Sequence, residues 1–155
     1  MSPAPTASAP PSEPSLGAST DLVSRHLRFG WLGLAIFVLV GAVLELLHAI
    51  KSPIYLDAGR ETTRLLLRLA HAHGTLLSFV NVLYALTVRA RARAASPLVS
   101  ASLLSSLVLL PGGFLLGGLW ASGGDPGLGV LLVPAGAVAL LVATTAIGAR
   151  LSRPE

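Results

Sequence analysis

Long runs of apolar residues dominate this chain, and polar residues gather between them. Four runs are found, at residues 29–50, 65–88, 98–121 and 128–149. Each reaches the roughly 20 residues that an α-helix needs to cross a hydrocarbon core of ~30 Å. The runs lack the alternation of a half-buried strand, and backbone groups in lipid must be paired within a helix or a closed barrel. The pattern therefore predicts an all-α protein, a four-helix transmembrane bundle.

The segment before the first run has a different composition. Residues 1–20 are rich in Pro, Ser, Ala and Thr and contain few large apolar side chains. Such a segment cannot bury enough surface to offset its ordering entropy. We expect residues 1–24 to form a disordered N-terminal tail and residues 25–155 to form the transmembrane domain. The first apolar run starts too late and is too long for a cleaved signal peptide, so it is predicted to stay as an anchor.

The overall composition also indicates lipid as the solvent. Hydrophobic residues make up 53% of the chain and charged residues 12%, whereas soluble domains have roughly 25% charged residues. Cysteine is absent, which excludes disulfides, thiolate metal sites and cysteine nucleophiles. The net charge of +4 does not indicate nucleic-acid binding, because the arginines flank the apolar runs and form no basic patch with aromatic residues. We expect the lipid bilayer as the partner, and a homo-oligomer or a partner membrane subunit remains open.

Basic residues are distributed unequally between the two ends of the predicted helices. Seven arginines lie at the end that holds both termini: Arg25, Arg28, Arg89, Arg91, Arg93, Arg150 and Arg153. Four basic residues lie at or just inside the other end: Lys51, Arg60, Arg64 and Arg68. The positive-inside rule then predicts a multi-pass protein of the bacterial inner membrane with both termini in the cytoplasm. His26 lies beside two of the flanking arginines, and we expect it to be a solvated interface residue.

Ionisable residues gather where the first two apolar runs meet. Glu45 and His48 lie near the end of the first run, and Arg68 and His71 lie near the start of the second. Ionisable groups within a span are costly, usually face the bundle interior, and indicate function. At 1.5 Å per residue, His48 lies at the depth of Arg68, and Glu45 at the depth of His71. We therefore expect Glu45, His48 and His71 to converge near the outer face, with Arg68 above them.

Helical spacing separates the two histidines of the second run. His71 shares a face with Thr75 and Ser78, and Asn81 lies about 60° to one side of that face. His73 lies ~200° around the helix from His71, so the two cannot hold one ion from the same regular turn. We expect this polar face to point towards other helices, with a supporting network formed by Arg68, Thr75, Ser78 and Asn81.

Three interpretations of this group of residues remain open. In a structural role, Glu45 accepts hydrogen bonds from Arg68 and His71, and the network holds the first two helices together. In a cofactor site, His48 and His71 are the first ligands of haem b or of a copper, zinc or iron ion, with His73 as an alternative and Glu45 as a ligand or supporting partner. In a small proton-coupled transporter, Glu45 and the histidines carry protons.

Enzymatic chemistry has little support in the sequence. No nucleophile elbow, phosphate loop, pair of catalytic carboxylates or zinc-protease motif is present. A substrate reaction is therefore not predicted, and we expect a redox or accessory role if a cofactor is bound.

Two resemblances add to this interpretation. The stretch His71-Ala72-His73-Gly74 resembles the His-x-His helices of membrane haem proteins, including the main subunit of haem–copper oxidases. That likeness implies haem ligation, but the chain has too few helices and histidines for an oxidase core. The longer pattern joins Leu-Glu-Leu-Leu-His at residues 44–48, Tyr-Leu-Asp at residues 55–57, the His-Ala-His-Gly helix and a glycine-rich third run. It is similar to small uncharacterised bacterial four-span proteins, which implies a fold and no activity.

Overall fold

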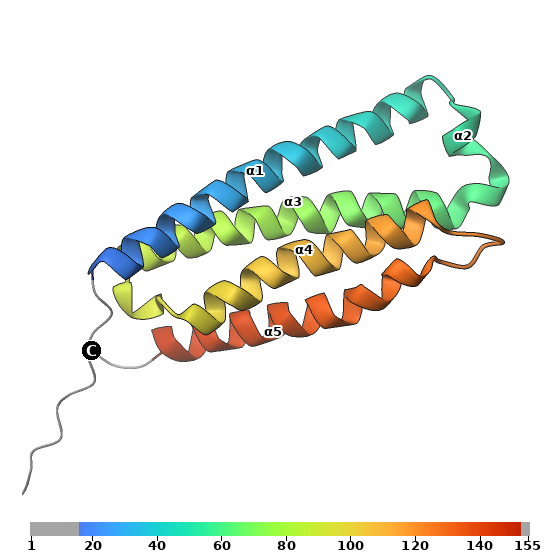
Figure 1. Ribbon diagram of the computed structural model, residues 1–155. Helices are drawn as coiled ribbons and strands as arrows, with labels where there is room; N and C mark the ends of the chain where they lie inside the picture. The colour runs from blue at the N-terminus through green and yellow to red at the C-terminus, as the bar shows by residue number, and fades with distance from the viewer. Residues whose placement is uncertain (1–15, 153–155) are drawn as a thin grey trace, which may run out of the picture.

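The computed structural model describes residues 16–152, whose regular structure is helical apart from an isolated bridge between Ser122 and Asp125. Four long helices alternate in direction along the chain (Figure 1). They are α1 (Leu16–Ala49), α3 (Glu61–Ala90), α4 (Pro97–Leu119) and α5 (Leu132–Leu151). The short helix α2 (Pro53–Leu56) and the 3-10 turns η1 (Ala58–Arg60), η2 (Ala92–Ala94) and η3 (Leu128–Leu131) connect them. The prediction of an all-α protein with four long helices is confirmed.

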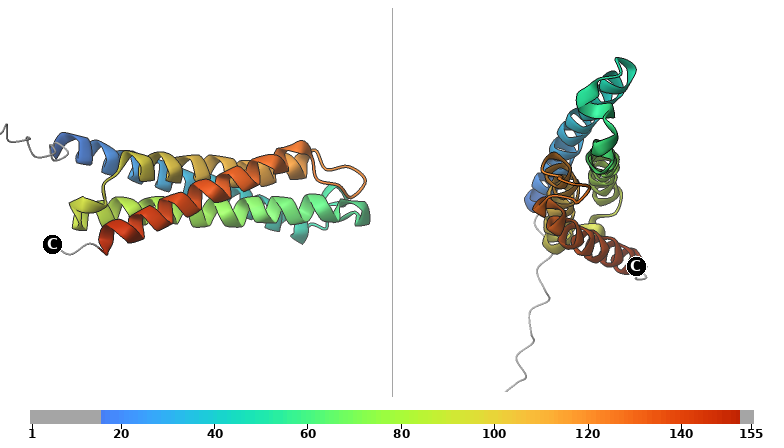
Figure 2. Two further views of the ribbon diagram at one scale, coloured as in Figure 1. Left: turned by 90° about the horizontal axis from the view of Figure 1, so that it is seen from below. Right: turned by 90° about the vertical axis from the view of Figure 1, so that its right-hand side faces the viewer.

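The long helices pack mainly in chain order. α1 lies against α3, α3 against α4, and α4 against α5, so that α1 and α5 form the two ends of the series (Figures 1 and 2). α1 begins and α5 ends at the same end of the molecule, which also holds η2 and is called here the η2 end. The opposite end, called the α2 end, holds α2 and the turn between α4 and α5 (Figure 1). The arrangement is an open series of antiparallel helices.

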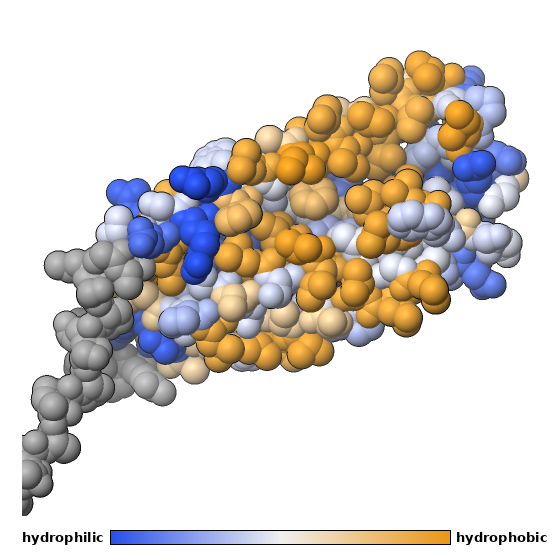
Figure 3. All heavy atoms as spheres, in the orientation of Figure 1, coloured by the Kyte–Doolittle hydropathy of each residue, from blue (hydrophilic) through white to orange (hydrophobic). Residues whose placement is uncertain are grey.

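The outer surface of the helices is apolar. All four long helical segments are long and apolar enough to cross a membrane. Large apolar side chains such as Leu39 and Leu141 are more than 60% exposed. On the face drawn in Figure 3, such residues cover the length of the helices, and hydrophilic residues gather towards the two ends. Because a water-soluble protein rarely exposes so much continuous apolar surface, the chain is a multi-pass membrane protein whose helices face lipid.

The helices are held together most tightly at the η2 end. A core cluster there joins Leu22 of α1, Tyr84 and Val88 of α3, and Val99 and Leu103 of α4. Towards the α2 end, α1 diverges from the other helices (Figures 1 and 2). The divergence separates the last turns of α1 from α3, which determines how the residues predicted to converge are arranged.

The first helix begins earlier than the sequence pattern predicted. α1 starts at Leu16, within the region 1–24 that was predicted to be a disordered tail, so the helix extends further towards the N-terminus than the predicted span. Leu22 and His26 are four residues apart on one helical face, and both are buried. Packing of this face stabilises helix where the composition alone indicated none. The rest of the predicted tail, residues 1–15, lies outside the described residues.

Candidate functional site

The side chain of His71 is fixed between α1 and α3. Its Nδ1 lies 2.7 Å from the backbone carbonyl oxygen of Phe37. Because a carbonyl oxygen only accepts hydrogen bonds, Nδ1 carries the proton and donates it. In the neutral ring Nε2 then has a free lone pair, and it makes no hydrogen bond to any residue between 16 and 152. His71 therefore presents an oriented acceptor nitrogen that is available to a ligand.

Two glycines allow this close approach of α1 and α3. A Cβ at position 41 would stand 2.6 Å from Nδ1 and 2.8 Å from Nε2 of His71. A Cβ on Gly74 of α3 would likewise overlap the ring of Phe37 on α1. Each glycine thus makes room for a ring from the facing helix, and the two contacts together set the position of the His71 imidazole.

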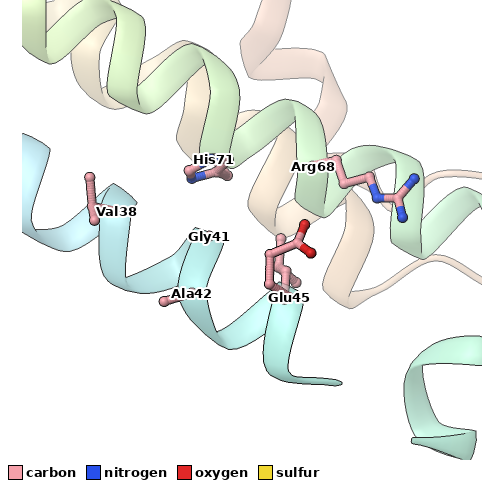
Figure 4. Close-up of a pocket in the computed structure, with 7 residues that line it drawn as sticks. Val38, Gly41, Ala42, Glu45, Arg68 and His71 are labelled. Carbon is pink, nitrogen blue, oxygen red and sulfur yellow. The ribbon is translucent and has the colours of Figure 1, made fainter. Parts of the chain in front are cut away.

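A pocket of about 270 Å³ opens between the two helices next to this imidazole (Figure 4). In Figure 4, Glu45 points from α1 towards α3, and Arg68 extends from α3 away from His71. Val38 and Ala42 are exposed, so that the pocket is open on their side of α1. We call it the His71 pocket; its lining residues are Val38, Gly41, Ala42, Leu44, Glu45, Arg68 and His71.

Glu45 and Arg68 line the same pocket without pairing. Both side chains are exposed, and neither forms an ion pair or a hydrogen bond with a residue that the structure describes. The network of the structural interpretation, in which Glu45 accepts hydrogen bonds from Arg68 and His71, is therefore not formed among the described residues. His71 donates to Phe37 instead. The pocket holds an unpaired carboxylate, an unpaired guanidinium and a free imidazole nitrogen.

The other two predicted histidines lie elsewhere. His48 is exposed in the last turn of α1, with its ring centroid 6.5 Å from that of Tyr55 in α2. His73 lies 5.0 Å from the ring of Phe114 on α4 and hydrogen-bonds through Nδ1 to the carbonyl oxygen of Leu69 at 2.9 Å. The separation of His71 from His73 agrees with the helical spacing. Within residues 16–152, no group of three or more His, Asp or Glu side chains could hold a metal ion.

The supporting polar face on α3 is only partly as expected. Ser78 and Asn81 are fully buried, as an inward face requires, and bond to backbone carbonyls of their own helix at 2.7 and 2.8 Å. The hydroxyl oxygen of Thr75 is buried without a hydrogen-bond partner among the described residues. Asn81 also connects α3 to a residue that the sequence pattern had assigned to the solvated interface.

That residue is His26, and the prediction that it is solvated is wrong. Its side chain is fully buried, with Nδ1 2.7 Å from Oδ1 of Asn81 and Nε2 2.8 Å from Oγ of Ser100. Arg25 donates to the same hydroxyl oxygen at 2.7 Å. His26 therefore joins α1 to both α3 and α4.

The protonation pattern of this network follows from its donors. The amide nitrogen of Asn81 donates to the carbonyl oxygen of Leu77, so Oδ1 is the atom that accepts the Nδ1–H of His26. Ser100 accepts from Arg25 and can give its own proton to Nε2 of His26. A neutral imidazole thus satisfies every member of the network.

The spacing of α1 contained a signal for His26. Leu22, His26, Gly30 and Gly33 are buried residues at intervals of four, four and three, which is the inward stripe of a helix. The arginines beside His26 obscured that stripe, because they indicated a membrane flank.

The comparisons with known proteins give no relative: no family model, no curated protein and no solved structure matches this chain. The chemistry of the His71 pocket is therefore argued from its own residues. An imidazole nitrogen with a fixed lone pair can coordinate a metal or accept a hydrogen bond. The guanidinium of Arg68 can bind an anion, and the carboxylate of Glu45 can bind or stabilise a cation.

Proposed function

We propose that this chain is a membrane protein that binds haem b through His71, in a redox or accessory role. One observation carries the proposal: His71 donates Nδ1–H to the carbonyl of Phe37 and leaves Nε2 free at a pocket between two helices. Histidines that bind metals almost always donate their other ring N–H to a carbonyl or carboxylate, which fixes the ring and raises its basicity. Haem iron is commonly held by one such histidine.

The small number of side chains that could coordinate a metal favours haem over a bare metal ion. Copper, zinc and iron ions held by protein side chains usually take three or four of them. The His71 pocket offers His71 and Glu45 as ligands. A porphyrin would supply four nitrogen ligands of its own, so a single histidine from the protein would be sufficient. The alternative ligands His48 and His73 lie outside the pocket, which leaves His71 as the residue best placed to bind iron.

The surroundings of His71 also suit a porphyrin. Val38, Ala42 and Leu44 give the pocket an apolar wall, and exposed Val38 and Ala42 adjoin the lipid-facing surface of α1. A flat apolar macrocycle loses little by lying partly against lipid, whereas a hydrated metal ion would lose its water there. Glu45 provides a negative charge on the facing helix, where it can stabilise ferric iron.

The proposed orientation places the His71 pocket near the outer face of the bacterial inner membrane. Arg25 and Arg28 lie in the first half of α1, Arg89 lies near the end of α3 and Arg150 near the end of α5, and these parts of the helices form the η2 end. The positive-inside rule assigns such an end to the cytoplasm. The α2 end, with Glu45 and Arg68 nearby, then faces the periplasm.

The decisive experiment is an optical spectrum of the detergent-solubilised protein after addition of hemin, recorded before and after dithionite. We expect a Soret band that shifts on reduction. His71→Ala should lose the band, while His48→Ala and His73→Ala should retain it. A preparation from haem-competent cells that is colourless and fails to bind added hemin would contradict the proposal. Loss of the band in His73→Ala alone would indicate that His73, which lies against α4, is the haem ligand instead of His71.

A structural role is the second candidate, and the His26 network favours it. That network shows that buried polar side chains of this chain can serve to join helices, since His26 links α1, α3 and α4 with every group satisfied. In that case the hydrogen bond from His71 to Phe37 is a further link between α1 and α3. His71→Ala would then lower the melting temperature, and the wild-type protein would bind no hemin.

A further inference from the structure

Arg68 differs from Arg64 and Arg150 in lining a pocket without a partner among residues 16–152. Arg64, one turn nearer the α2 end, donates to the carbonyl oxygens of Tyr55 and Asp57 at 3.1 and 2.8 Å. Arg150, at the η2 end, donates to two backbone carbonyls of the η2 segment. Arg68 makes neither a hydrogen bond nor an ion pair with any residue from 16 to 152.

Arg68 has no partner although a side chain of opposite charge lines the same pocket. Glu45 lines the same pocket from α1, yet the two groups form no ion pair. A guanidinium within a membrane span is costly unless it is paired or reaches the interface. An arginine that lines a pocket with all its donors free is available to a ligand that carries an anion.

The position of Arg68 relative to His71 defines where that anion would lie. The two residues are three apart on α3, so they share a face, and Arg68 lies about 4.5 Å nearer the α2 end along the helix axis. Both line the His71 pocket. An amphipathic ligand bound at His71 can therefore place a carboxylate on Arg68 while its apolar body lies beside Val38, deeper in the span.

We propose that Arg68 recognises a carboxylate of the ligand that binds at His71. The proposal rests on the proposed function, in which the two propionates of haem supply the carboxylate. It fixes the direction of the porphyrin: the propionate edge faces the α2 end and water, and the other edge faces the hydrocarbon core. A planar guanidinium binds a carboxylate with two parallel hydrogen bonds, so the contact gives direction as well as affinity.

The test compares hemin with its dimethyl ester, which has the same iron and macrocycle but no anionic carboxylates. Binding is measured by absorbance titration of the full-length protein in detergent, for wild type, Arg68→Gln, Arg68→Lys and the control Arg60→Gln. Arg60 is exposed in η1 and lies outside the pocket. We expect wild type and Arg60→Gln to bind hemin at least about tenfold tighter than the ester. Arg68→Gln should bind both equally, and Arg68→Lys should keep part of the preference.

The outcomes separate this inference from the proposed function. If wild type binds hemin and its ester equally, or Arg68→Gln keeps the preference, the role of Arg68 is overturned while haem binding stands. If neither porphyrin binds, the haem proposal fails. A parallel titration with radiolabelled palmitate then decides the role of Arg68. Palmitate binding that is lost in Arg68→Gln would support carboxylate recognition for a fatty acid, and equal or absent binding would overturn it.

Discussion

The imidazole of His71 lies so close to Gly41 that any side chain at position 41 would overlap it. The ring is held between this glycine and the carbonyl oxygen of Phe37, both on α1. His71 also lies three residues from Gly74, which contacts Phe37, so packing between α1 and α3 restricts the rotation of the imidazole. Such fixation reduces the entropy that a ligand would otherwise lose on binding.

Gly41→Ala should displace the His71 ring and break its hydrogen bond to Phe37. We expect hemin affinity to fall and the free energy of unfolding to drop by about 1–3 kcal/mol, as for other overpacked contacts. Hemin titration and thermal unfolding in detergent measure the two effects. Gly112→Ala on α4 is the matched control, because no atom lies within 4 Å of a Cβ added there. Unchanged hemin binding in Gly41→Ala would contradict the assignment of His71.

Glu45→Gln should raise the midpoint potential of bound haem. Ferric haem carries one more positive charge than ferrous haem, so the carboxylate across the pocket stabilises the ferric form. Removal of a partly screened charge worth about 1 kcal/mol corresponds to a rise on the order of 40 mV in a one-electron potential. A spectroelectrochemical titration measures the shift. Glu61→Gln, at the exposed start of α3, should leave the potential unchanged. A fall in potential in Glu45→Gln would refute this role.

The number of long helices followed directly from the sequence. An apolar run that spans the hydrocarbon core has few alternatives to a helix, because lipid offers its backbone no hydrogen-bond partners. The start of α1 did not follow, because contacts such as those of Leu22 and Val23 with the core at the η2 end stabilise this part of the helix. Composition records the polarity of that segment and contains no information about what it packs against.

Only part of the site was predicted, because the sequence does not show how the helices pack against one another. Counting residues from the helix ends correctly placed Glu45, Arg68 and His71 around one pocket. It failed for His48, because spacing gives depth and face but not the angle at which two helices diverge. α1 separates from α3 towards the α2 end, and its last turn carries His48 away from the pocket to Tyr55. His26 was missed because neighbouring arginines outweighed its position on the buried stripe.

Ser100→Ala should destabilise the η2 end of the protein. The substitution removes the hydroxyl that both Arg25 and His26 contact, and leaves a buried imidazole nitrogen without a partner. We expect a loss of about 1–3 kcal/mol in the free energy of unfolding, since buried polar groups are costly when unpaired. Ser105→Ala on the exposed face of the same helix is the control and should change little. Equal melting temperatures for the two variants would argue against the network.

Topology reporters should place the two ends of the molecule on opposite sides of the membrane. A periplasm-active reporter enzyme fused after Arg93, in the η2 segment, should be inactive, because the positive-inside rule predicts that the η2 end lies in the cytoplasm. The same enzyme inserted near Gly59, in the η1 segment at the α2 end, should be active. The basic residues at the α2 end, including Arg60 and Arg64, favour the opposite orientation. The reporter experiment therefore distinguishes between the two orientations. The reverse pattern would put the His71 pocket near the cytoplasmic face, where its ligand would arrive from inside the cell.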